Sequence, residues 1–391
     1  MNTTSLPTTR PQIPVAKPFL GSEEESAVRD VLRSGWIAQG PRVAEFEKRF
    51  AQYVGADHAI AVSSCTTALH LALLAAGVGA RDEVICPSLS FIATANSIAY
   101  TGAAPVFVDI VRETYNLDPT QVEESITPKT RAILAVHQIG LPCAMDEICR
   151  IAARHDLVVV EDAACAIGSE YHDHRIGSPQ GKFACFSFHP RKILTTGEGG
   201  MITTSDSGMA ARLRQLRQHG MSVSDVVRHS ARQVVIETYD EVGFNYRMTD
   251  LQAAVGIVQL GRLEDLLERR RSLAARYTAR LQGLGWITAP HVPQDCRHNF
   301  QSYMVRLLPN APMSRDSVMQ ELLEKGISTR RGVMAIHREH PYQDARWQKT
   351  LPETDAAAEE TLILPLFHQM TEEEQDYVIG CIRDIGINGA R

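Results

Sequence analysis

The chain of 391 residues has a formal net charge of −6 and contains 8 cysteines, and these values exclude several classes of protein. Its acidic balance does not indicate a nucleic-acid-binding surface, and no apolar run approaches the roughly 20 residues that span a bilayer. The cysteines show neither a CxxC motif nor His/Cys ligand spacing, so no metal site and no disulfide framework are expected. The polar, proline-rich first residues do not resemble a signal peptide. The sequence therefore predicts a reduced, cytoplasmic protein without a nucleic-acid or membrane partner.

Residues 1–20 are expected to form an extended arm, which leads into two predicted helices. Ser22 and Glu25 have the spacing of a capping box, so an amphipathic helix is expected from there to Leu32. A second helix is expected within residues 35–55, because four apolar side chains recur there at helical spacing: Val43, Phe46, Phe50 and Val54.

From residue 58 onward, short apolar segments alternate with segments of helical character. The expected strands cover residues 58–62, 83–87, 104–110, 131–137 and 157–163. The expected helices between them cover residues 63–77, 91–102, 119–126 and 144–155. Such alternation is typical of parallel strands joined by crossover helices, and it predicts a doubly wound α/β sheet. In a sheet of this kind, ligands bind beyond the carboxyl ends of the strands.

Lys192 lies in a polar loop between two expected strands, within the segment FSFHPRKILTTGEGGMI of residues 186–202. Pro190 before the lysine and the glycines after it give this loop a defined path and allow close approach of backbone to a ligand. An amine in such a loop is a candidate for capturing a carbonyl cofactor as a Schiff base. For a lysine taken alone, an ordinary exposed loop residue is the commoner interpretation.

Asp162 favours the cofactor-binding interpretation of Lys192 over that of an exposed loop residue. It stands at the carboxyl end of the apolar strand VVVED, 30 residues before Lys192 (192 − 162 = 30). Pyridoxal phosphate requires a lysine for its aldehyde, an acid for its ring nitrogen and a cradle for its phosphate. We therefore expect both residues to be catalytic: Asp162 would keep the ring nitrogen protonated, and Lys192 would move protons as general base and acid.

The start of the helix expected at residues 63–77 is a candidate phosphate cradle. It carries four hydroxyl side chains, those of Ser63, Ser64, Thr66 and Thr67. Unpaired N–H groups and the helix dipole bind anions at such a place, although simple N-capping is the alternative. Phe91 follows the strand of residues 83–87 and is placed to stack on a cofactor ring, with core packing as an equally good alternative.

The rest of the chain is expected to form a surface excursion at residues 221–242, followed by a second domain. Residues 243–281 predict a polar turn, a helix cap at Thr249 and one long helical run that acts as a hinge. Arg269–Arg271 is interpreted as a charged helix surface. The expected division, after the arm, is a large α/β domain and a smaller α+β domain, over residues 21–255 and 256–391.

Five segments, in their order and spacing, resemble the DegT/DnrJ-type sugar aminotransferases: SSCTTALHLAL, FIATANSI, EDAACAIG, FSFHPRKILTTGEGGMI and GFNYRMTDLQAAVG. The resemblance covers nearly the whole chain from about residue 14, and the lysine and EDAA segments are its most specific parts. It implies a pyridoxal-phosphate-dependent enzyme with the aspartate aminotransferase fold (fold type I). That fold has a mostly parallel seven-stranded sheet in the large domain and a smaller C-terminal α+β domain. The resemblance also implies a homodimer.

The resemblance assigns roles to individual residues. Lys192 matches the lysine that holds the cofactor, and Asp162 matches the partner of its ring nitrogen. The other cofactor contacts that it implies are Ser64, Cys65, Thr66, Phe91, Cys165, Ser187 and Asn245. Asn245 matches an asparagine that reaches the phosphate site of a neighbouring subunit, so the active sites of the dimer would be composite.

The chain departs from the family pattern at three places. Cys65 stands where many members have glycine, and Cys165 stands where relatives often have glutamine or histidine. Residues 137–146, HQIGLPCAMD, are an altered version of a segment closer to HLYG-x-P-x-D, which indicates an unusual substrate side. Lys192 itself is present, whereas a histidine there would indicate a dehydratase.

By resemblance, the amino donor is glutamate and the acceptor is a keto group, most often at C4, of a nucleotide-linked deoxy sugar. Its product would serve a cell-surface polysaccharide or a secondary metabolite. An anionic substrate on an acidic protein requires local cations, and Arg330 and Arg331 are candidates, with a plain surface role as the alternative. The other expected substrate contacts are His189, Tyr303 and His337. Transfer to C3 or to a non-sugar ketone, and an inactive protein that only binds the cofactor, remain alternatives.

Overall fold

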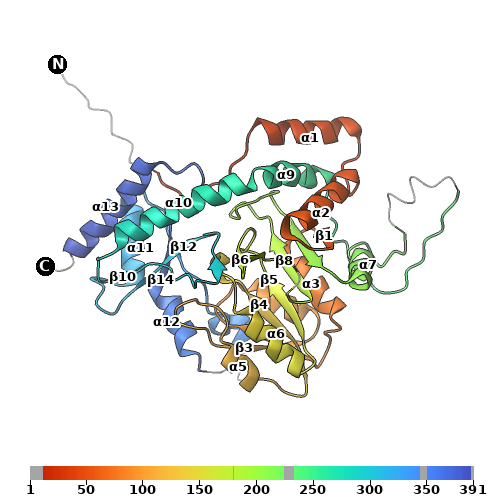
Figure 1. Cartoon of the computed structure of the whole chain (residues 1–391), viewed down its shortest axis with the longest axis horizontal. Helices are drawn as coiled ribbons and strands as arrows, with labels where there is room; N and C mark the ends of the chain where they lie inside the picture. The colour runs from red at the N-terminus through yellow and green to blue at the C-terminus, as the bar shows by residue number, and fades with distance from the viewer. Residues whose placement is uncertain (1–11, 179, 224–232, 344–349, 389–391) are drawn as a thin grey trace.

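The computed structural model describes residues 12–178, 180–223, 233–343 and 350–388 (Figure 1). Within these residues, a seven-stranded sheet has the strand order β1-β9-β8-β5-β4-β2-β3. In that order, the strands are His58–Val62, Gly200–Thr204, Phe183–Ser187, Val158–Asp162, Thr130–Val136, Glu83–Pro87 and Ala104–Val108. β9 runs antiparallel to both of its neighbours, and the other neighbouring pairs are parallel. The mostly parallel α/β sheet predicted from the sequence is confirmed.

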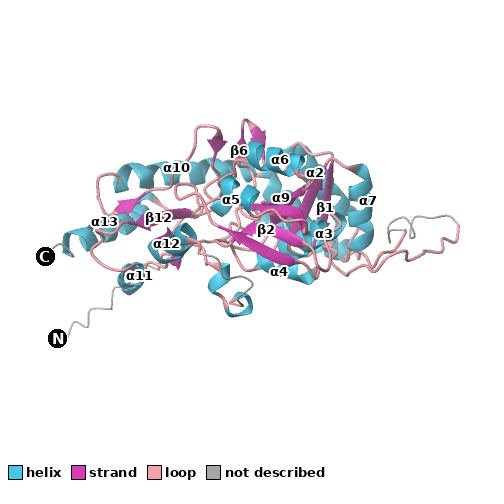
Figure 2. Ribbon diagram, turned by 90° about the horizontal axis from the view of Figure 1, so that it is seen from below, coloured by secondary structure: helices cyan, strands magenta, loops and turns pink. Residues whose placement is uncertain are grey.

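Helices cover both faces of this sheet (Figure 2), and the helices on each face pack against the sheet to form a separate apolar core. One core includes side chains from α3 (Cys65–Ala75), α4 (Ala93–Tyr100) and α7 (Ser207–Leu216). The other includes side chains from α2 (Pro41–Val54), α5 (Pro119–Glu124), α6 (Met145–Arg154) and α9 (Asp250–Gly261). The apolar stripe predicted for α2 is confirmed, since its four members are all at most 2% exposed: Val43, Phe46, Phe50 and Val54.

The N-terminal region agrees with the predicted arm and corrects the predicted helix cap. From residue 12 the arm is irregular, and Ile13 pairs with Ile327 of the C-terminal part. Helix α1 covers Ser22–Ser34, and its N-cap is Gly21 rather than Ser22. The Gly21 N–H donates to Glu24 Oε2 at 2.8 Å. The side-chain-to-backbone bond of the capping box is therefore made by Glu24 and Gly21, one residue earlier than the predicted pair of Glu25 and Ser22.

The long helical run predicted after residue 243 is interrupted at Arg262. Thr249 caps α9 as predicted, because its hydroxyl accepts from the Gln252 N–H at 3.2 Å. Helix α10 then covers Leu263–Leu281. The predicted domain boundary between residues 255 and 256 falls inside α9, which packs against α1 and α2.

The C-terminal part forms a second layer around an antiparallel sheet of order β10-β12-β14-β13 within the described residues. These strands are Ile287–Thr288, Tyr303–Leu307, Thr361–Leu364 and Arg330–Arg331. Its helices are α11 (Arg315–Glu324), α12 (Pro352–Glu360) and α13 (Glu372–Asn388). Short elements complete the fold: β6 (Glu170–Tyr171), β7 (His174–Arg175), β11 (Cys296–Arg297), η1 (Gln138–Gly140), η2 (Ile336–Arg338) and η3 (His340–Tyr342).

The arginine triplet on α10 holds backbone carbonyls, which corrects its interpretation as a charged surface. Arg270 is 7% exposed and donates to the carbonyls of Phe300 and Gln301. Arg271 donates to the carbonyls of His298 and Gly168. Arginine suits this task, because its guanidinium offers several donors in a fixed fork. Arg270 and Arg271 therefore fasten α10 to the segment before β12, and Arg269 donates to the Met370 carbonyl.

The excursion predicted at residues 221–242 extends from the body of the molecule as far as the structure describes it (Figure 1). Met221 pairs with Tyr239, while residues 224–232 lie outside the described part. Val234 and Val242 are 92% and 86% exposed. In the described residues, no helix is both long and apolar enough to cross a membrane.

Candidate active site

A cavity of about 1200 Å³ opens where the central strands end. Val136 of β4, Asp162 of β5 and Ser187 of β8 line it from the side of the large sheet. Parts of α11, β13 and β14 line it from the C-terminal side, and Val15 and Ala16 of the arm also contribute. Its position agrees with the rule for doubly wound sheets, in which ligands bind at the carboxyl edge.

Lys192 reaches this cavity from the loop between β8 and β9. Its backbone N–H donates to the His189 carbonyl at 2.8 Å, and its Nζ lies 2.9 Å from Cys165 Sγ. Burial acts to lower the pKa of the amine, but the acidic groups of Cys165, Cys65 and Asp162 outweigh burial and raise that pKa overall. The lysine is therefore stabilised as an ammonium beside acceptors that line the same cavity.

Asp162 is the last residue of β5, and its carboxylate is 6% exposed at the cavity wall. Thr94 Oγ1 donates to Oδ2 at 3.0 Å, and the Ala164 N–H donates to Oδ1 at 3.2 Å. Burial raises the pKa of Asp162, whereas these hydrogen bonds and the Lys192 ammonium oppose that rise. A cation placed against this carboxylate would favour its charged form.

The start of α3 forms a concave edge of the cavity. Ser64 caps the helix by accepting from the Thr67 N–H at 3.2 Å, so the capping alternative holds. The N–H groups of Cys65 and Thr66, in the first turn, have no acceptor within the helix and stay available for an anion. Gly200 of β9 packs tightly here, since a Cβ on it would lie 2.5 Å from the Ser64 carbonyl.

Phe91 and Ser187 complete the predicted cofactor surroundings. The Phe91 ring is 65% exposed and lines the cavity, so the alternative of core packing is wrong. Ser187 ends β8, pairs with Gly200 across the sheet and lines the cavity as well. Six of the expected cofactor residues thus share one cavity with Lys192 and Asp162: Ser64, Cys65, Thr66, Phe91, Cys165 and Ser187.

Comparison with known proteins places this geometry in a family. A model of the DegT/DnrJ/EryC1/StrS aminotransferase family matches residues 18–383. The chain is 41% identical over 383 residues to the spore coat polysaccharide biosynthesis protein SpsC of Bacillus subtilis, covering 97% of this chain and 98% of that protein. It is 43% identical over 377 residues to GDP-perosamine synthase of Caulobacter vibrioides, covering 96% and 98%.

A solved structure with the cofactor named in its description is similar throughout. The PLP-form of the sugar aminotransferase Spr1654 of Streptococcus pneumoniae, described as putative, aligns with a TM-score of 0.90 at 30% identity, covering 97% of this chain and 100% of that chain. The chain belongs to the DegT/DnrJ/EryC1/StrS aminotransferase family. The resemblance drawn from the sequence segments is confirmed, and the enzyme is a pyridoxal-phosphate-dependent aminotransferase.

The chemical groups that line the cavity of this aminotransferase are those that pyridoxal phosphate requires. A carboxylate, a lysine amine and a helix start with free N–H groups line one cavity, as the ring nitrogen, the aldehyde and the phosphate require. The tight approach of Gly200 to Ser64 keeps β9 pressed against that helix start. Asp162 would hold the ring nitrogen and Lys192 the aldehyde carbon.

Sequence reasoning missed three residues that support the aminotransferase site. Thr94 donates to Asp162, as described above. His137 and Glu161 form a pair 3.0 Å apart, with side chains 0% and 1% exposed. His137 Nδ1 accepts from the Cys143 N–H, so Nε2 carries the proton toward Glu161. The position of His137 in the sequence could have indicated it, because His137 directly follows β4 just as Asp162 ends the neighbouring strand β5.

On the substrate side, the structure brings together some of the predicted residues. His189, Arg330 and Arg331 line the cavity, and both arginines are also exposed, so their position is compatible with a substrate contact and with the surface role. Arg191, which sequence reasoning did not single out, lines it as well. Burial, and next the charge of Arg330, lower the pKa of Arg191. These two guanidiniums therefore repel each other and favour an anion between them.

Tyr303 and His337 are placed differently from the prediction. Tyr303 is 0% exposed, stacks on Tyr277 with ring centroids 4.9 Å apart, and its hydroxyl lies 2.9 Å from Thr278 Oγ1. In β12 it points into the core of the C-terminal layer, because strand alternation sends it away from the cavity. His337 does not line the cavity, and its ring is occupied by Ser88 and Asp355.

Asn245 lies apart from the cavity of its own chain. It is exposed, and its backbone pairs with Gln218 in an isolated bridge. Among the described residues, it is not one of those that line the cavity. This position is compatible with the predicted contact across a dimer and does not test it.

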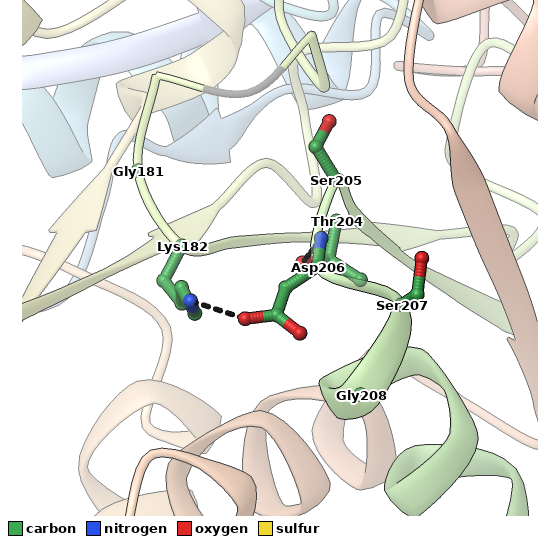
Figure 3. A pocket seen from close by; sticks show the side chains of 7 residues that line it. All are labelled: Gly181, Lys182, Thr204, Ser205, Asp206, Ser207 and Gly208. Atoms are coloured by element: carbon green, nitrogen blue, oxygen red, sulfur yellow. Dashed lines mark hydrogen bonds and ion pairs between the residues drawn. The ribbon is translucent and has the colours of Figure 1, made fainter.

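A second hollow lies between β8, β9 and the start of α7 (Figure 3). Lys182 Nζ and Asp206 Oδ2 point toward each other across it at 2.6 Å. Asp206 also caps α7 by accepting from the Met209 N–H. The pair therefore joins the residue before β8 to the residue that caps α7.

Proposed function

We propose that this aminotransferase moves an amino group from glutamate to a keto group, at C4, of a nucleotide-linked deoxy sugar. The proposal is supported by one arrangement: the Lys192 amine and the Asp162 carboxylate line a cavity whose rim carries Arg191, Arg330 and Arg331. It is further supported by relatives whose names state polysaccharide biosynthesis and GDP-perosamine synthesis. The product would be an amino sugar for a cell-surface polysaccharide or a secondary metabolite.

Two residues would perform the proton chemistry. When bound, the cofactor supplies an electron sink for the negative charge that develops on the amino carbon. Asp162 would keep its ring nitrogen protonated through an ion pair in a dry site. Lys192, released by the incoming amine, would take a proton from one carbon and return it to another, because its loop keeps it within reach.

The arginines at the rim would hold the substrate's anionic diphosphate. Arg330 and Arg331 form β13, and Arg191 precedes the catalytic lysine. Among the described residues, neither Arg191 nor Arg330 has a carboxylate partner, so both remain available to a ligand. Guanidinium groups suit phosphate oxygens because they bind them in a bidentate manner. His189, which also lines the cavity, would contact the sugar.

The remaining features of the proposal come from the sequence. We propose a homodimer in the cytoplasm, in which Asn245 of one subunit reaches the cofactor phosphate of the other. A division into an arm, a large domain and a small domain is retained, with the boundary placed at the break at Arg262. That position replaces the one first expected, since α9 packs with the helices of the large domain.

Borohydride reduction of the holoenzyme, followed by peptide mapping, tests the assignment of the lysine. The label is expected on Lys192, and Lys192→Ala should remove it. Lys182, the amine paired with Asp206 in the second hollow, is the matched control, and Lys182→Ala should retain the label. A label on any other lysine contradicts the proposed site.

Substrate identity is tested by incubation with glutamate and a panel of nucleotide-linked keto sugars. The expected result is 2-oxoglutarate together with a sugar aminated at C4, as located by NMR of the product. Amination at C3, or of a non-sugar ketone, would keep the enzyme class and overturn the proposed substrate. A labelled protein that turns over nothing in the panel, and releases no 2-oxoglutarate, would favour a cofactor-binding protein without catalysis.

A further inference from the structure

A single carboxamide, that of Gln301, bonds the backbone on both sides of Lys192. Its Nε2 donates to the Arg191 carbonyl at 2.7 Å, and its Oε1 accepts from the Ile193 N–H at 3.1 Å. A carbonyl only accepts and an N–H only donates, so the orientation of this amide is fixed by its two partners. The two peptide groups that flank Lys192 are thereby fastened to one side chain.

Gln301 belongs to a segment that is itself held firmly. Its N–H donates to Asn299 Oδ1 at 2.8 Å, and its carbonyl accepts from Arg270 on α10 at 2.7 Å. Gln301 is 7% exposed and Asn299 is 0% exposed. Between them, Phe300 adopts φ of 50°, a left-handed conformation that a bulky residue keeps only where its surroundings impose it.

The same segment also holds the partner of the lysine amine. Asn299 Nδ2 donates to the Cys165 carbonyl at 2.7 Å and to the Ile167 carbonyl at 2.9 Å. Cys165 Sγ is the atom that Lys192 Nζ meets at 2.9 Å. Residues 299–301 therefore fix, through two amide side chains, both ends of the contact between Lys192 and Cys165.

We propose that Gln301 is a positioning residue for Lys192 and that it sets the direction of the amine in the active site. The inference rests on the proposed role of Lys192. Gln301 also lines the cavity, but its Nε2 and Oε1 both bond the loop backbone, so we assign its effect to the lysine, and a nearly unchanged KM distinguishes this role from a substrate contact. A lysine side chain has four rotatable bonds, and a small tilt of its Cα moves Nζ by a distance that matters for proton transfer.

The decisive variant is Gln301→Leu, which keeps a similar volume and removes both hydrogen bonds. Its matched control is Gln375→Leu, since Gln375 is 0% exposed and its Nε2 donates to the Leu273 carbonyl at 2.7 Å, within the C-terminal layer. Both variants lose a buried carboxamide, and only the first one touches the lysine loop. Gln301→Glu is the milder variant, because it keeps an acceptor for the Ile193 N–H and loses the donor to Arg191.

The first readout needs neither cofactor nor substrate. Hydrogen–deuterium exchange of the Ile193 amide in the cofactor-free protein should become at least about tenfold faster in Gln301→Leu, because its acceptor is gone. Exchange at Ile193 should stay at the wild-type rate in Gln375→Leu, even when both variants unfold at a similarly lowered temperature. If Gln301→Leu does not fold, a smaller acceleration at Ile193 is expected in Gln301→Glu, because its carboxylate repels the Arg191 carbonyl and displaces the loop although an acceptor for the Ile193 N–H is kept.

The second readout follows the lysine in the holoenzyme. The pH midpoint of the cofactor–lysine absorbance should shift in Gln301→Leu, and kcat should fall roughly 10²-fold, with KM for the keto sugar within about threefold. Gln375→Leu should keep the wild-type midpoint and kcat. Wild-type exchange at Ile193 together with a wild-type midpoint in the Gln301 variants would overturn the proposal. A borohydride label away from Lys192 would instead refute the proposed function, while the exchange result would still decide the contact.

Discussion

Two neighbouring carboxylates of β5, Glu161 and Asp162, have different surroundings and so different uses. Glu161 is committed on both oxygens, since one accepts from the Gly181 N–H at 2.8 Å and the other meets His137 at 3.0 Å. Among the described residues, Asp162 accepts hydrogen bonds from the Thr94 hydroxyl and the Ala164 N–H, and it lines the cavity. Both oxygens of Glu161 are thus occupied by neighbours of its own chain, whereas Asp162 faces the cavity, where a cation can reach it. The cofactor's ring nitrogen is therefore assigned to Asp162.

Asp162→Asn should retain the fold and lose most of the catalytic rate. The neutral amide cannot stabilise a protonated ring nitrogen, so kcat should fall by roughly 10²-fold or more in single-turnover measurements with glutamate. Glu161→Gln is the matched control in the same strand, because it weakens the pair with His137 and should affect the thermal midpoint more than kcat. Near-normal turnover in Asp162→Asn would mean that another group tunes the ring.

The sequence allowed functional residues to be predicted where the segment around a residue indicates its role. Lys192 and Asp162 could be found because one stands in a Pro–Gly loop and the other ends an apolar strand. Thr94 and Gln301 could not be found, since each acts through one partner that is distant in sequence and brought close only by folding. Tyr303 was misplaced because neither the sheet pairing nor the facing core of its strand was known.

At the scale of elements, one carboxylate joins two helices. Asp250 begins α9 and is 2% exposed, and it accepts from three N–H groups at the start of α2, those of Gly40, Arg42 and Val43. It therefore caps a helix more than 200 residues away along the chain (250 − 41 = 209). Capping rules based on sequence consider only residues adjacent to the helix in the chain, so they did not reveal this contact.

Asp250→Ala should destabilise the protein strongly. Three donors at the start of α2 lose a charged acceptor in a buried place, and the expected loss is about 3 kcal/mol or more in denaturant unfolding. Asp118→Ala is the matched control, because Asp118 caps the short α5 through one exposed bond to the Thr120 N–H. That variant should lose about 1 kcal/mol or less. Equal losses would contradict the capping role of Asp250.

The buried segment before β12 should make stability depend on acidity. Burial lowers the pKa of His298 from 6.5 to about 3, and the charges of Arg271 and Arg270 also lower it. Below pH 6.5, His298 binds a proton in the unfolded chain but stays neutral in the folded chain. The free energy of unfolding therefore falls as pH decreases, until about pH 3. The maximum slope is about 1.4 kcal/mol per pH unit.

His298→Asn removes this titration and keeps an acceptor near the Phe300 N–H, which His298 Nδ1 receives at 3.1 Å. The thermal midpoint of the wild type should therefore fall more steeply than that of the variant between pH 6.5 and 4.5. Each curve is compared with its own value at pH 7.5, which cancels any constant loss caused by the substitution. Parallel curves over this range would show that His298 titrates normally in the folded state.

For the whole molecule, the α/β architecture was predictable and its junctions were not. Apolar β-branched segments in regular alternation determine parallel strands, and their carboxyl edge determines where the cavity lies. The end of α9 was missed because the helical pattern continues beyond Gly261 and Arg262, and a single glycine within such a pattern is only a weak stop signal. The antiparallel direction of β9 was likewise not predictable, because the loop that carries Lys192 has 12 residues (199 − 188 + 1 = 12), a length that permits either direction.

The surface of the single chain supports the proposed dimer. Val234, Ile236 and Val242 of the excursion are each more than 80% exposed, and they stand on a segment that extends from the body of the molecule (Figure 1). Large apolar side chains gathered on an extended segment suggest an interaction surface. Asn245 follows directly after this segment and is exposed as well. A second copy that covers the excursion would thus bring Asn245 toward a neighbouring site.

Mixing one weakened variant with one inactive variant tests whether that site is composite. Asn245→Ala should weaken cofactor retention, and Lys192→Ala should remove turnover. In a hybrid dimer with twofold symmetry, one site receives both defects and the other receives neither, so activity should partly return once subunits exchange. Double-variant chains mixed with themselves provide the control, because every site then carries both defects. A monomer at working concentration, or no recovery after exchange verified by mass spectrometry of the mixed dimers, would show that Asn245 does not serve a neighbouring active site.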